Sequence, residues 1–176
     1  LVGSMPFILY LQALGGKPLA FFRDNQVQWF IGFCLISTLL ITWWLVTKLS
    51  APPTTAIRYA AFNTISVITG TGYTTAPYDT WGSFPIAILF FLMFVGGCTG
   101  STTGGIKIFR FQVLFNSARA ELALLMHPHS VATPKFNGEP IPSGIANAVR
   151  GFFFVFLAGF MVTALALGLH GYDFIT

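Results

Sequence analysis

The chain has 176 residues, of which 55% are hydrophobic and only 8% are charged, and its mean hydropathy is +0.74. A soluble domain carries about 25% charged residues, so this composition excludes an ordinary water-soluble fold and indicates an integral membrane protein. The net charge of +4 does not indicate nucleic-acid binding, because the basic residues are not gathered in one exposed stripe. No constellation of acid, base and nucleophile stands out, so we expect no enzymatic activity.

The first apolar stretch, residues 2–14, lacks the basic leader and the cleavage site of a secretory signal. The chain begins at Leu1 without a methionine, and it ends shortly after another apolar segment. We therefore expect a fragment of a longer membrane protein. The two cysteines, Cys34 and Cys98, lie in apolar stretches and do not indicate a disulfide framework.

The first spanning helix is predicted over residues 27–47, which carry no charge. About twenty such residues suffice to cross a hydrocarbon core of roughly 30 Å. Trp43 and Trp44 lie near its end, where indole rings favour the membrane interface. The run Ser50-Ala51-Pro52-Pro53 is expected to stop the helix, because proline cannot continue the hydrogen-bond ladder.

A short helix is predicted next, over residues 55–68, with Thr54 or Thr55 as its cap. At 1.5 Å per residue it would reach only about 21 Å, too short to cross the membrane. It carries Arg58 and Asn63, which lipid disfavours. A short helix that enters the membrane and stops is typical of a re-entrant pore helix. We expect Arg58 to snorkel or to pair outside the pore.

The run Thr69-Gly70-Thr71-Gly72-Tyr73 follows this helix directly. Glycine tolerates the unusual φ values that turn successive carbonyls toward one axis, and rings of such carbonyls can replace the hydration shell of potassium. The negative end of the helix macrodipole would also favour a cation there. We therefore interpret these five residues as a potassium-binding selectivity filter; a structural turn rich in small residues is the alternative. Asp79, beyond the filter, either attracts cations or caps local structure.

A second spanning helix, broken midway, is predicted over residues 84–116. As one helix this stretch would measure roughly 50 Å, far more than the membrane needs. The ten residues 96–105 contain five glycines, each of which disfavours a helix by close to 1 kcal/mol relative to alanine. The interruption is either a gate or a site of close helix packing through small residues. It lacks the Gly-Lys-Ser/Thr ending of a nucleotide loop, so phosphate binding is weakly indicated.

Residues 117–144 are predicted to form a helix and a polar loop, and residues 145–176 to begin with a third spanning helix. His127 and His129 could bind a metal, but two loop histidines without further ligands are more commonly solvated. Only Lys48 and Arg58 would lie outside the cell if the spans alternate, which favours a cytoplasmic 117–144 loop. The other seven of the nine basic residues would lie inside: Lys17, Arg23, Lys107, Arg110, Arg119, Lys135 and Arg150.

The order of spanning helix, short helix, Thr/Gly run and spanning helix is that of potassium-channel-like pores. The sequence resembles the membrane subunit of the Trk/Ktr/HKT potassium transporters, most closely the bacterial TrkH type. The resemblance covers essentially the whole chain and rests on the runs Phe62–Tyr73, Phe84–Cys98, Gly100-Ser101-Thr102 and Gly104-Gly105-Ile106-Lys107.

The resemblance implies an all-α integral membrane fold with four helix–pore loop–helix units in one polypeptide. Residues 1–24 would end the second unit and form a cytoplasmic link. Residues 25–116 would be a complete unit, residues 117–144 cytoplasmic, and residues 145–176 would contain the outer helix of the fourth unit.

The family's filter falls on Thr69 to Tyr73, with Gly72 at the glycine that occurs once per unit. Gly70 replaces a common Thr and Tyr73 a usual Phe, which leaves ion preference open. The family's intramembrane loop, thought to act as a gate, falls on Gly96, Gly97, Gly100, Ser101, Thr102, Thr103, Gly104 and Gly105.

By the same resemblance we expect potassium uptake across the bacterial cytoplasmic membrane, down the gradient or with a coupled ion, and no organic cofactor. A homodimer, contact with lipid and a cytosolic nucleotide-binding regulatory subunit are also implied. A sodium-permeable member, a simple tetrameric cation channel and a non-conducting membrane scaffold are the alternatives. A third span after the pore loop disfavours the tetramer, whose subunits would end after two.

Overall fold

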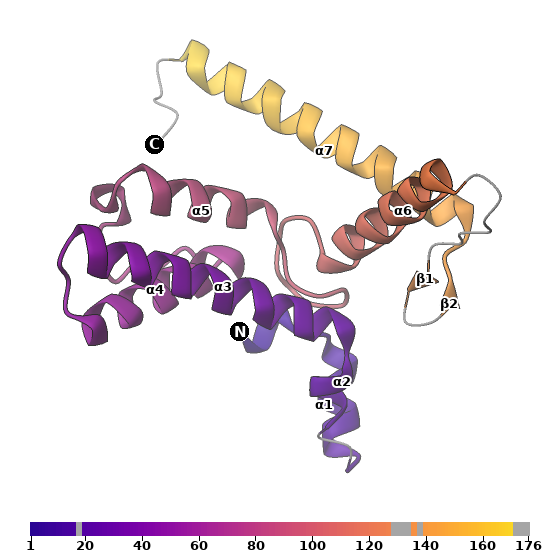
Figure 1. Cartoon of the computed structure of the whole chain (residues 1–176), viewed down its shortest axis with the longest axis horizontal. Helices are drawn as coiled ribbons and strands as arrows, with labels where there is room; N and C mark the ends of the chain where they lie inside the picture. The colour runs from indigo at the N-terminus through magenta and orange to yellow at the C-terminus, as the bar shows by residue number, and fades with distance from the viewer. Residues whose placement is uncertain (17–18, 128–134, 137–138, 171–176) are drawn as a thin grey trace. The chain divides into compact units, whose positions relative to one another are not determined.

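The computed structural model describes residues 1–16, 19–127, 135–136 and 139–170, and the chain divides into an N-terminal unit (Leu1–Phe111) and a C-terminal unit (Gln112–Thr176). The regular elements of the described residues are helices apart from one short pair of strands (Figure 1). The N-terminal unit contains η1 (Val2–Ser4), α1 (Phe7–Leu14), α2 (Ala20–Arg23), α3 (Asn25–Lys48), α4 (Pro53–Ile68), η2 (Tyr78–Trp81) and α5 (Ser83–Phe94). Helix α6 (Ile108–Met126) continues into the C-terminal unit, which also holds β1 (Lys135–Phe136), β2 (Glu139–Pro140) and α7 (Ser143–Leu169).

Helix α3 is long and apolar enough to cross a membrane, with 24 residues and a hydropathy of 2.0. It begins at a side-chain cap, because the Asp24 carboxylate accepts hydrogen bonds from the N–H groups of Gln26 and Val27 at 2.9 and 3.1 Å. It ends at Lys48, and Ser50 then adopts a left-handed conformation with φ of 52°. Helix α3 therefore ends four residues before Pro52, the first of the two prolines that were expected to stop it.

The predicted cap of the short helix is wrong. The N-cap residue of α4 is Pro52, no side chain caps the helix, and Pro53 occupies its first position. Proline suits that position because its fixed φ is helical and its missing N–H would have no intrahelical partner. Helix α4 therefore starts two residues before the predicted residue 55, with Thr54 and Thr55 inside its first turn.

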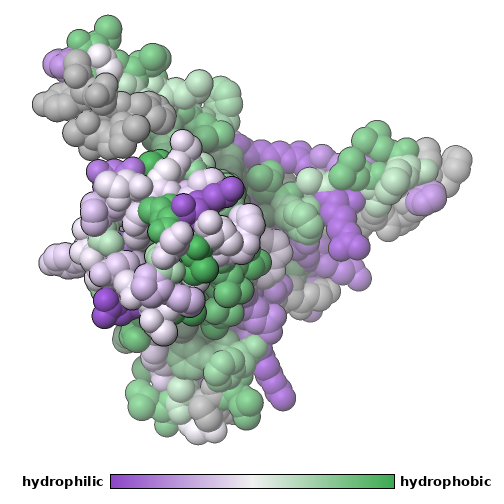
Figure 2. Space-filling view, turned by 60° about the vertical axis from the view of Figure 1, so that its left-hand side comes forward, coloured by the Kyte–Doolittle hydropathy of each residue, from purple (hydrophilic) through white to green (hydrophobic). Residues whose placement is uncertain are grey.

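The core of the N-terminal unit lies where α3, α4 and α5 pack side by side (Figure 1). Small residues of α4, Ala56 and Ala60, are fully buried there and allow the helices to approach closely. The opposite face of α3 exposes Leu35, Ile36 and Leu39. Figure 2 shows large hydrophobic areas on the molecular surface, as expected of helices that face lipid.

The helical path is interrupted between α5 and α6. Helix α5 ends at Phe94 with Val95 in an extended conformation, and α6 begins at Ile108. The ends of the intervening segment lie beside each other, because Val95 and Ile106 form a parallel bridge. The 12 residues of α5 would cover about 18 Å of the membrane, so α5 alone does not cross it.

In the C-terminal unit, α7 has a segment (Gly144–Leu169) with a hydropathy of 2.4 that is long enough to cross a membrane. An exposed ion pair joins Arg150 of α7 to Glu121 of α6, and such pairs contribute only about 0–1 kcal/mol. His127 is exposed at the end of α6. His129, the second histidine of the metal-site hypothesis, lies outside the described residues, as does Lys17.

Candidate functional site

The Thr/Gly run leaves the C-terminal end of α4 as irregular, largely exposed backbone. Thr69 is the C-cap residue in a right-handed helical conformation, and Gly70 and Gly72 have φ of 69° and 78°. Only glycine adopts such values readily. No atom of the described residues lies within 4 Å of a Cβ built at either glycine, so the requirement for glycine comes from the backbone conformation and not from crowding.

Three successive peptide N–H groups of this run point back at α4. Gly70 donates to the Val67 carbonyl at 3.0 Å, and Thr71 and Gly72 donate to the Ser66 carbonyl at 2.9 and 3.4 Å. In a planar trans peptide the C=O points opposite to the N–H of the same unit. The carbonyls of Thr69, Gly70 and Thr71 are therefore directed away from α4. Within the described part of the chain, no hydrogen bond is accepted by these three oxygens.

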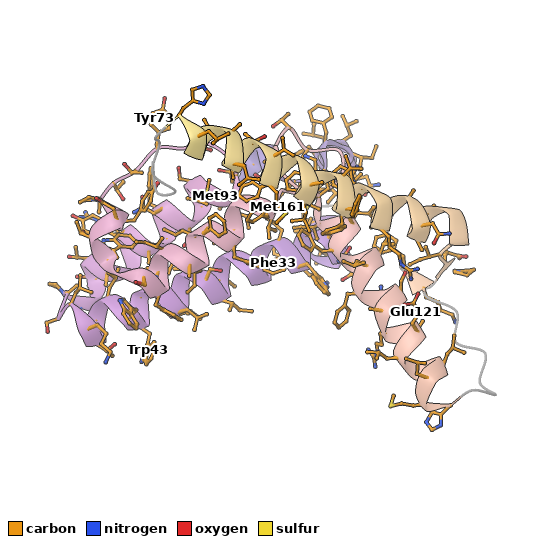
Figure 3. The ribbon with its side chains drawn as sticks, turned by 90° about the horizontal axis from the view of Figure 1, so that it is seen from above. Phe33, Trp43, Tyr73, Met93, Glu121 and Met161 are labelled. Atoms are coloured by element: carbon orange, nitrogen blue, oxygen red, sulfur yellow. The ribbon has the colours of Figure 1, made fainter. Side chains whose placement is uncertain are left out.

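The threonine side chains support the same backbone from the side. The Thr69 hydroxyl lies 2.7 Å from the Ile65 carbonyl, to which it donates, and 2.7 Å from the Thr71 hydroxyl. Tyr73, by contrast, is 73% exposed, and its side chain points away from the helices of its unit (Figure 3). Hydrogen bonds thus hold the run against α4, and its carbonyls on the opposite side are exposed.

A second anchor, which the sequence did not predict, lies after the run. Asn63 is fully buried in α4, and its amide nitrogen donates to the Tyr59 carbonyl at 3.0 Å. The Asn63 side chain also bonds both the hydroxyl and the N–H of Thr75, at 3.5 and 3.4 Å. The chain is therefore held to α4 at both ends of the segment from Thr71 to Thr75. In the sequence, the one sign of this anchor was the polar amide of Asn63 within a largely apolar helix.

Beyond this anchor the chain is tied to α3. The indole N–H of Trp44 donates to the carbonyl of Trp81 at 2.9 Å, so Trp44 supports the turn that leads into α5. Asp79 is exposed in the first turn of η2, whose N-cap residue is Pro77, so Asp79 does not cap this helix. Arg58 is exposed, with its guanidinium 5.1 Å from the centre of the Tyr59 ring.

The second candidate element is the loop between α5 and α6, and the N-terminal segment of the chain binds it. Cys98 and Thr102 donate their N–H groups to the carbonyls of Ser4 and Gly3 at 2.9 and 3.1 Å. The Phe7 N–H returns a bond to the Gly100 carbonyl at 3.3 Å. The loop is thus folded against residues 3–7 by backbone contacts that need no particular side chain.

Two glycines make the folded form of this loop possible by close approach. A Cβ at Gly96 would lie 2.3 Å from the Gly104 carbonyl oxygen, and one at Gly97 would lie 2.6 Å from the Ser4 oxygen. Both distances are shorter than any normal contact. Gly104 itself has open space at its Cβ position among the described atoms. The loop is therefore compact at Gly96 and Gly97, where its two limbs meet.

Lys107 points into the loop. Its ammonium donates to the Ser101 carbonyl and hydroxyl, both at 3.1 Å, to the Thr103 hydroxyl at 3.2 Å, and to the Thr103 carbonyl. From the sequence, Lys107 was expected only on the cytoplasmic side and at the end of the Gly104-Gly105-Ile106-Lys107 run, with no contact assigned to it. Nothing in the local sequence signals these contacts, because they depend on the folded loop.

Comparison with known proteins identifies the family of the chain. The family model TrkH, described as cation transport protein, matches residues 16–176. The chain is 40% identical over 176 residues to the Trk system potassium uptake protein TrkI of Halomonas elongata, covering 100% of this chain and 36% of that protein. It is 34% identical over 176 residues to the TrkH protein of Escherichia coli K12, covering 98% of this chain and 36% of that protein.

The fold agrees with the same family. The crystal structure of the potassium transporter TrkH from Vibrio parahaemolyticus matches with a TM-score of 0.90 at 32% identity, covering 98% of this chain and 38% of that one. The chain thus spans little more than a third of the length of these relatives, and the expectation of an all-α membrane fold is confirmed. Because the family model matches most of its length and the fold agrees with a solved member, this chain belongs to the TrkH family of cation transport proteins.

Proposed function

We propose that this chain supplies one of the four pore-loop units of a potassium uptake protein, and that Thr69 to Tyr73 form its quarter of the selectivity filter. The observation that carries the proposal is the orientation of three successive peptide groups, whose N–H groups bond to α4. Their carbonyls face the open side, where three further units would complete a ring of oxygens around a dehydrated cation. Potassium is the transported substrate in this proposal, and no organic cofactor is required.

The names of the relatives agree with this choice of ion. The Halomonas elongata and Escherichia coli proteins are named as Trk system potassium uptake proteins. The positions at which this chain departs from the family, Gly70 and Tyr73, lie in a segment where the main chain would bind the ion. Tyr73 lies after the three outward carbonyls, whereas Gly70 itself has the left-handed φ of 69°, so the choice of potassium over the sodium-permeable alternative rests on the names of the relatives.

The loop Gly96–Gly105 is proposed to be the barrier on the cytoplasmic side of the filter. It interrupts a spanning segment, and backbone is tolerated without helical bonding at membrane depth only where protein or water surrounds it. Several of the loop's oxygens and N–H groups instead bond to Gly3, Ser4, Phe7 and Lys107. Such polar contacts can be exchanged for water when the loop moves, whereas buried apolar packing cannot.

The same proposal places the protein in the bacterial cytoplasmic membrane, with the pore loop entering from outside and Asp79 near the external mouth. The distribution of basic residues supports this orientation. A homodimer and a cytosolic nucleotide-binding regulatory subunit follow from the family resemblance, and the term "Trk system" in the relatives' names agrees with more than one component.

The proposal is tested by Gly72→Ser in the full-length protein, expressed in cells that lack other potassium uptake. A residue with a side chain disfavours the left-handed conformation by about 1–2 kcal/mol, which corresponds to roughly a tenfold change in an equilibrium constant. We expect growth to require about tenfold more external potassium, with sodium competing better.

Gly32→Ser is the matched control, because Gly32 lies in α3 with open space around its Cβ position and no positive φ. It should leave potassium-dependent growth unchanged. Uptake affinity and selectivity that are the same in both variants and in the parent would remove Gly72 from the filter. A parent protein that is inserted in the membrane but takes up no potassium would favour the scaffold alternative.

A further inference from the structure

Lys107 has an environment unlike that of a solvated surface lysine. Four oxygens of the loop surround its ammonium: two carbonyl oxygens and two hydroxyl oxygens, all from Ser101 and Thr103. An ammonium has three donors, so the four acceptors share them. Lys107 is half-buried, and within the described residues it forms no ion pair with a carboxylate. Its charge is therefore balanced by dipoles of the loop.

This set of oxygens has the chemistry of a site for a monovalent cation. Backbone carbonyls and hydroxyls replace the hydration shell of potassium in filters, and an ammonium group carries the same charge in a comparably small volume. Lys107 thus brings its own tethered cation to the loop. Without the ammonium of Lys107, the carbonyl and hydroxyl oxygens of Ser101 and Thr103 would lie close together with no cation between them. Their mutual repulsion would disfavour the folded loop.

The contacts of Lys107 also join the two limbs of the loop. The hydroxyls of Ser101 and Thr103 lie 3.0 Å apart. The Thr103 hydroxyl accepts from the Gly97 N–H at 2.8 Å, and the Ser101 hydroxyl donates to the Cys98 carbonyl at 2.5 Å. One ammonium immediately before α6 is therefore connected through two hydroxyls to the residues immediately after α5.

We propose that Lys107 is the residue that holds the Gly96–Gly105 loop in its folded form, and that the loop opens only when the ammonium leaves its four oxygens. The inference rests on the proposed conducting function, since it names what keeps the barrier closed. Lys107 acts on transport through the loop, so it is a positioning residue and not part of the filter.

The buried thiol of Cys98 reports on the loop independently of transport. Cys98 is 0% exposed, and its backbone bonds join the loop to Ser4 and to Ser101. In the full-length protein with Cys98 as the sole cysteine, a small maleimide labels Cys98 only when the loop opens. The labelling rate therefore measures the open fraction even if no ion is conducted.

Lys107→Ala should raise this labelling rate by about tenfold or more, because several charge-assisted hydrogen bonds are lost together. Ser101→Ala, which removes one hydroxyl and keeps the charge, should raise it by a smaller factor. Lys48→Ala, the same substitution at the exposed end of α3, should leave it unchanged. Propylammonium replaces the missing atoms of the lysine, so it should slow labelling of Lys107→Ala, whereas propanol should not.

Folded protein is verified by size-exclusion chromatography before labelling. Folded Lys107→Ala with the labelling rate of the parent would overturn the inference, as would equal effects of propylammonium and propanol. Potassium flux in proteoliposomes is measured on the same samples, and it should rise in Lys107→Ala. A parent that conducts no potassium would contradict the proposed function but would leave the labelling result to decide the role of Lys107.

Discussion

At the scale of single residues, Ser66 and Asn63 determine how the filter-like run is presented. The Ser66 carbonyl accepts two N–H groups of the run, and the Asn63 side chain holds Thr75. The carbonyls of Thr69, Gly70 and Thr71, whose peptide N–H groups bond to α4, face away from that helix. Because both anchors belong to one rigid helix, the position of the carbonyls depends on α4 and little on the exposed side chains of the run.

Asn63→Leu should therefore disturb selectivity as well as stability. The substitution keeps the number and branching of the side-chain heavy atoms, although Leu is bulkier, and it removes the hydrogen bonds of the amide to Thr75 and to the Tyr59 carbonyl, each of which contributes about 0.5–1.5 kcal/mol. We expect a lower melting temperature and a severalfold smaller preference for rubidium over sodium in flux competition. Phe62→Leu, at the exposed neighbouring position, is the control. Unchanged selectivity in folded Asn63→Leu would contradict the second anchor.

The sequence predicted the residues of this region better than their contacts. It placed Asn63 on a short helix and the glycines after it, because helix breakers and unusual polar residues are visible locally. The partner of Asn63 lies twelve positions on, at Thr75, and it becomes a partner only through the turn that Gly70 and Gly72 permit. The predicted threonine cap was wrong because Pro53 can itself occupy the first helical position.

At the scale of elements, the break between α5 and α6 follows from composition, but its compact fold does not. Glycines between two apolar runs predicted the interruption. The loop docks on Gly3 and Ser4, which are distant in the sequence. Lys107 is close in sequence to its partners, but its contacts form only when the loop folds back on itself. These contacts need the three-dimensional fold, so sequence reasoning left open whether the loop is a gate or a packing element.

Substitutions of two loop glycines should have unequal effects. Gly96→Ala places a Cβ against the Gly104 carbonyl, so the limbs of the loop must separate, whereas Gly104→Ala meets open space. Overpacking of this kind destabilises by about 1–3 kcal/mol. We expect Gly96→Ala to increase potassium leak in proteoliposomes at unchanged filter selectivity, and Gly104→Ala to match the parent. Equal flux in the two folded variants would exclude the folded loop as the barrier.

At the scale of the whole molecule, the proposed pore requires a defined orientation in the membrane. Asp79 should be outside and the β1–β2 segment inside, because most basic residues lie on one side of the predicted spans. In a full-length background without other cysteines, Asp79→Cys should react with an impermeant thiol reagent only from outside, and Glu139→Cys only from the cytoplasm. Both positions are exposed within their own units. Labelling of both from one side would contradict the orientation and the re-entrant course of α4.

The central claim is that carbonyl oxygens of Thr69 to Tyr73 bind the transported ion. Rubidium replaces potassium in such sites and scatters anomalously, so an anomalous difference map of the full-length protein in rubidium tests the claim directly. We predict a peak on the pore axis within about 3 Å of the carbonyl oxygens of Thr69, Gly70 and Thr71, and its loss in Gly72→Ser. A map with ordered rubidium elsewhere on the axis but none beside these carbonyls would contradict the account.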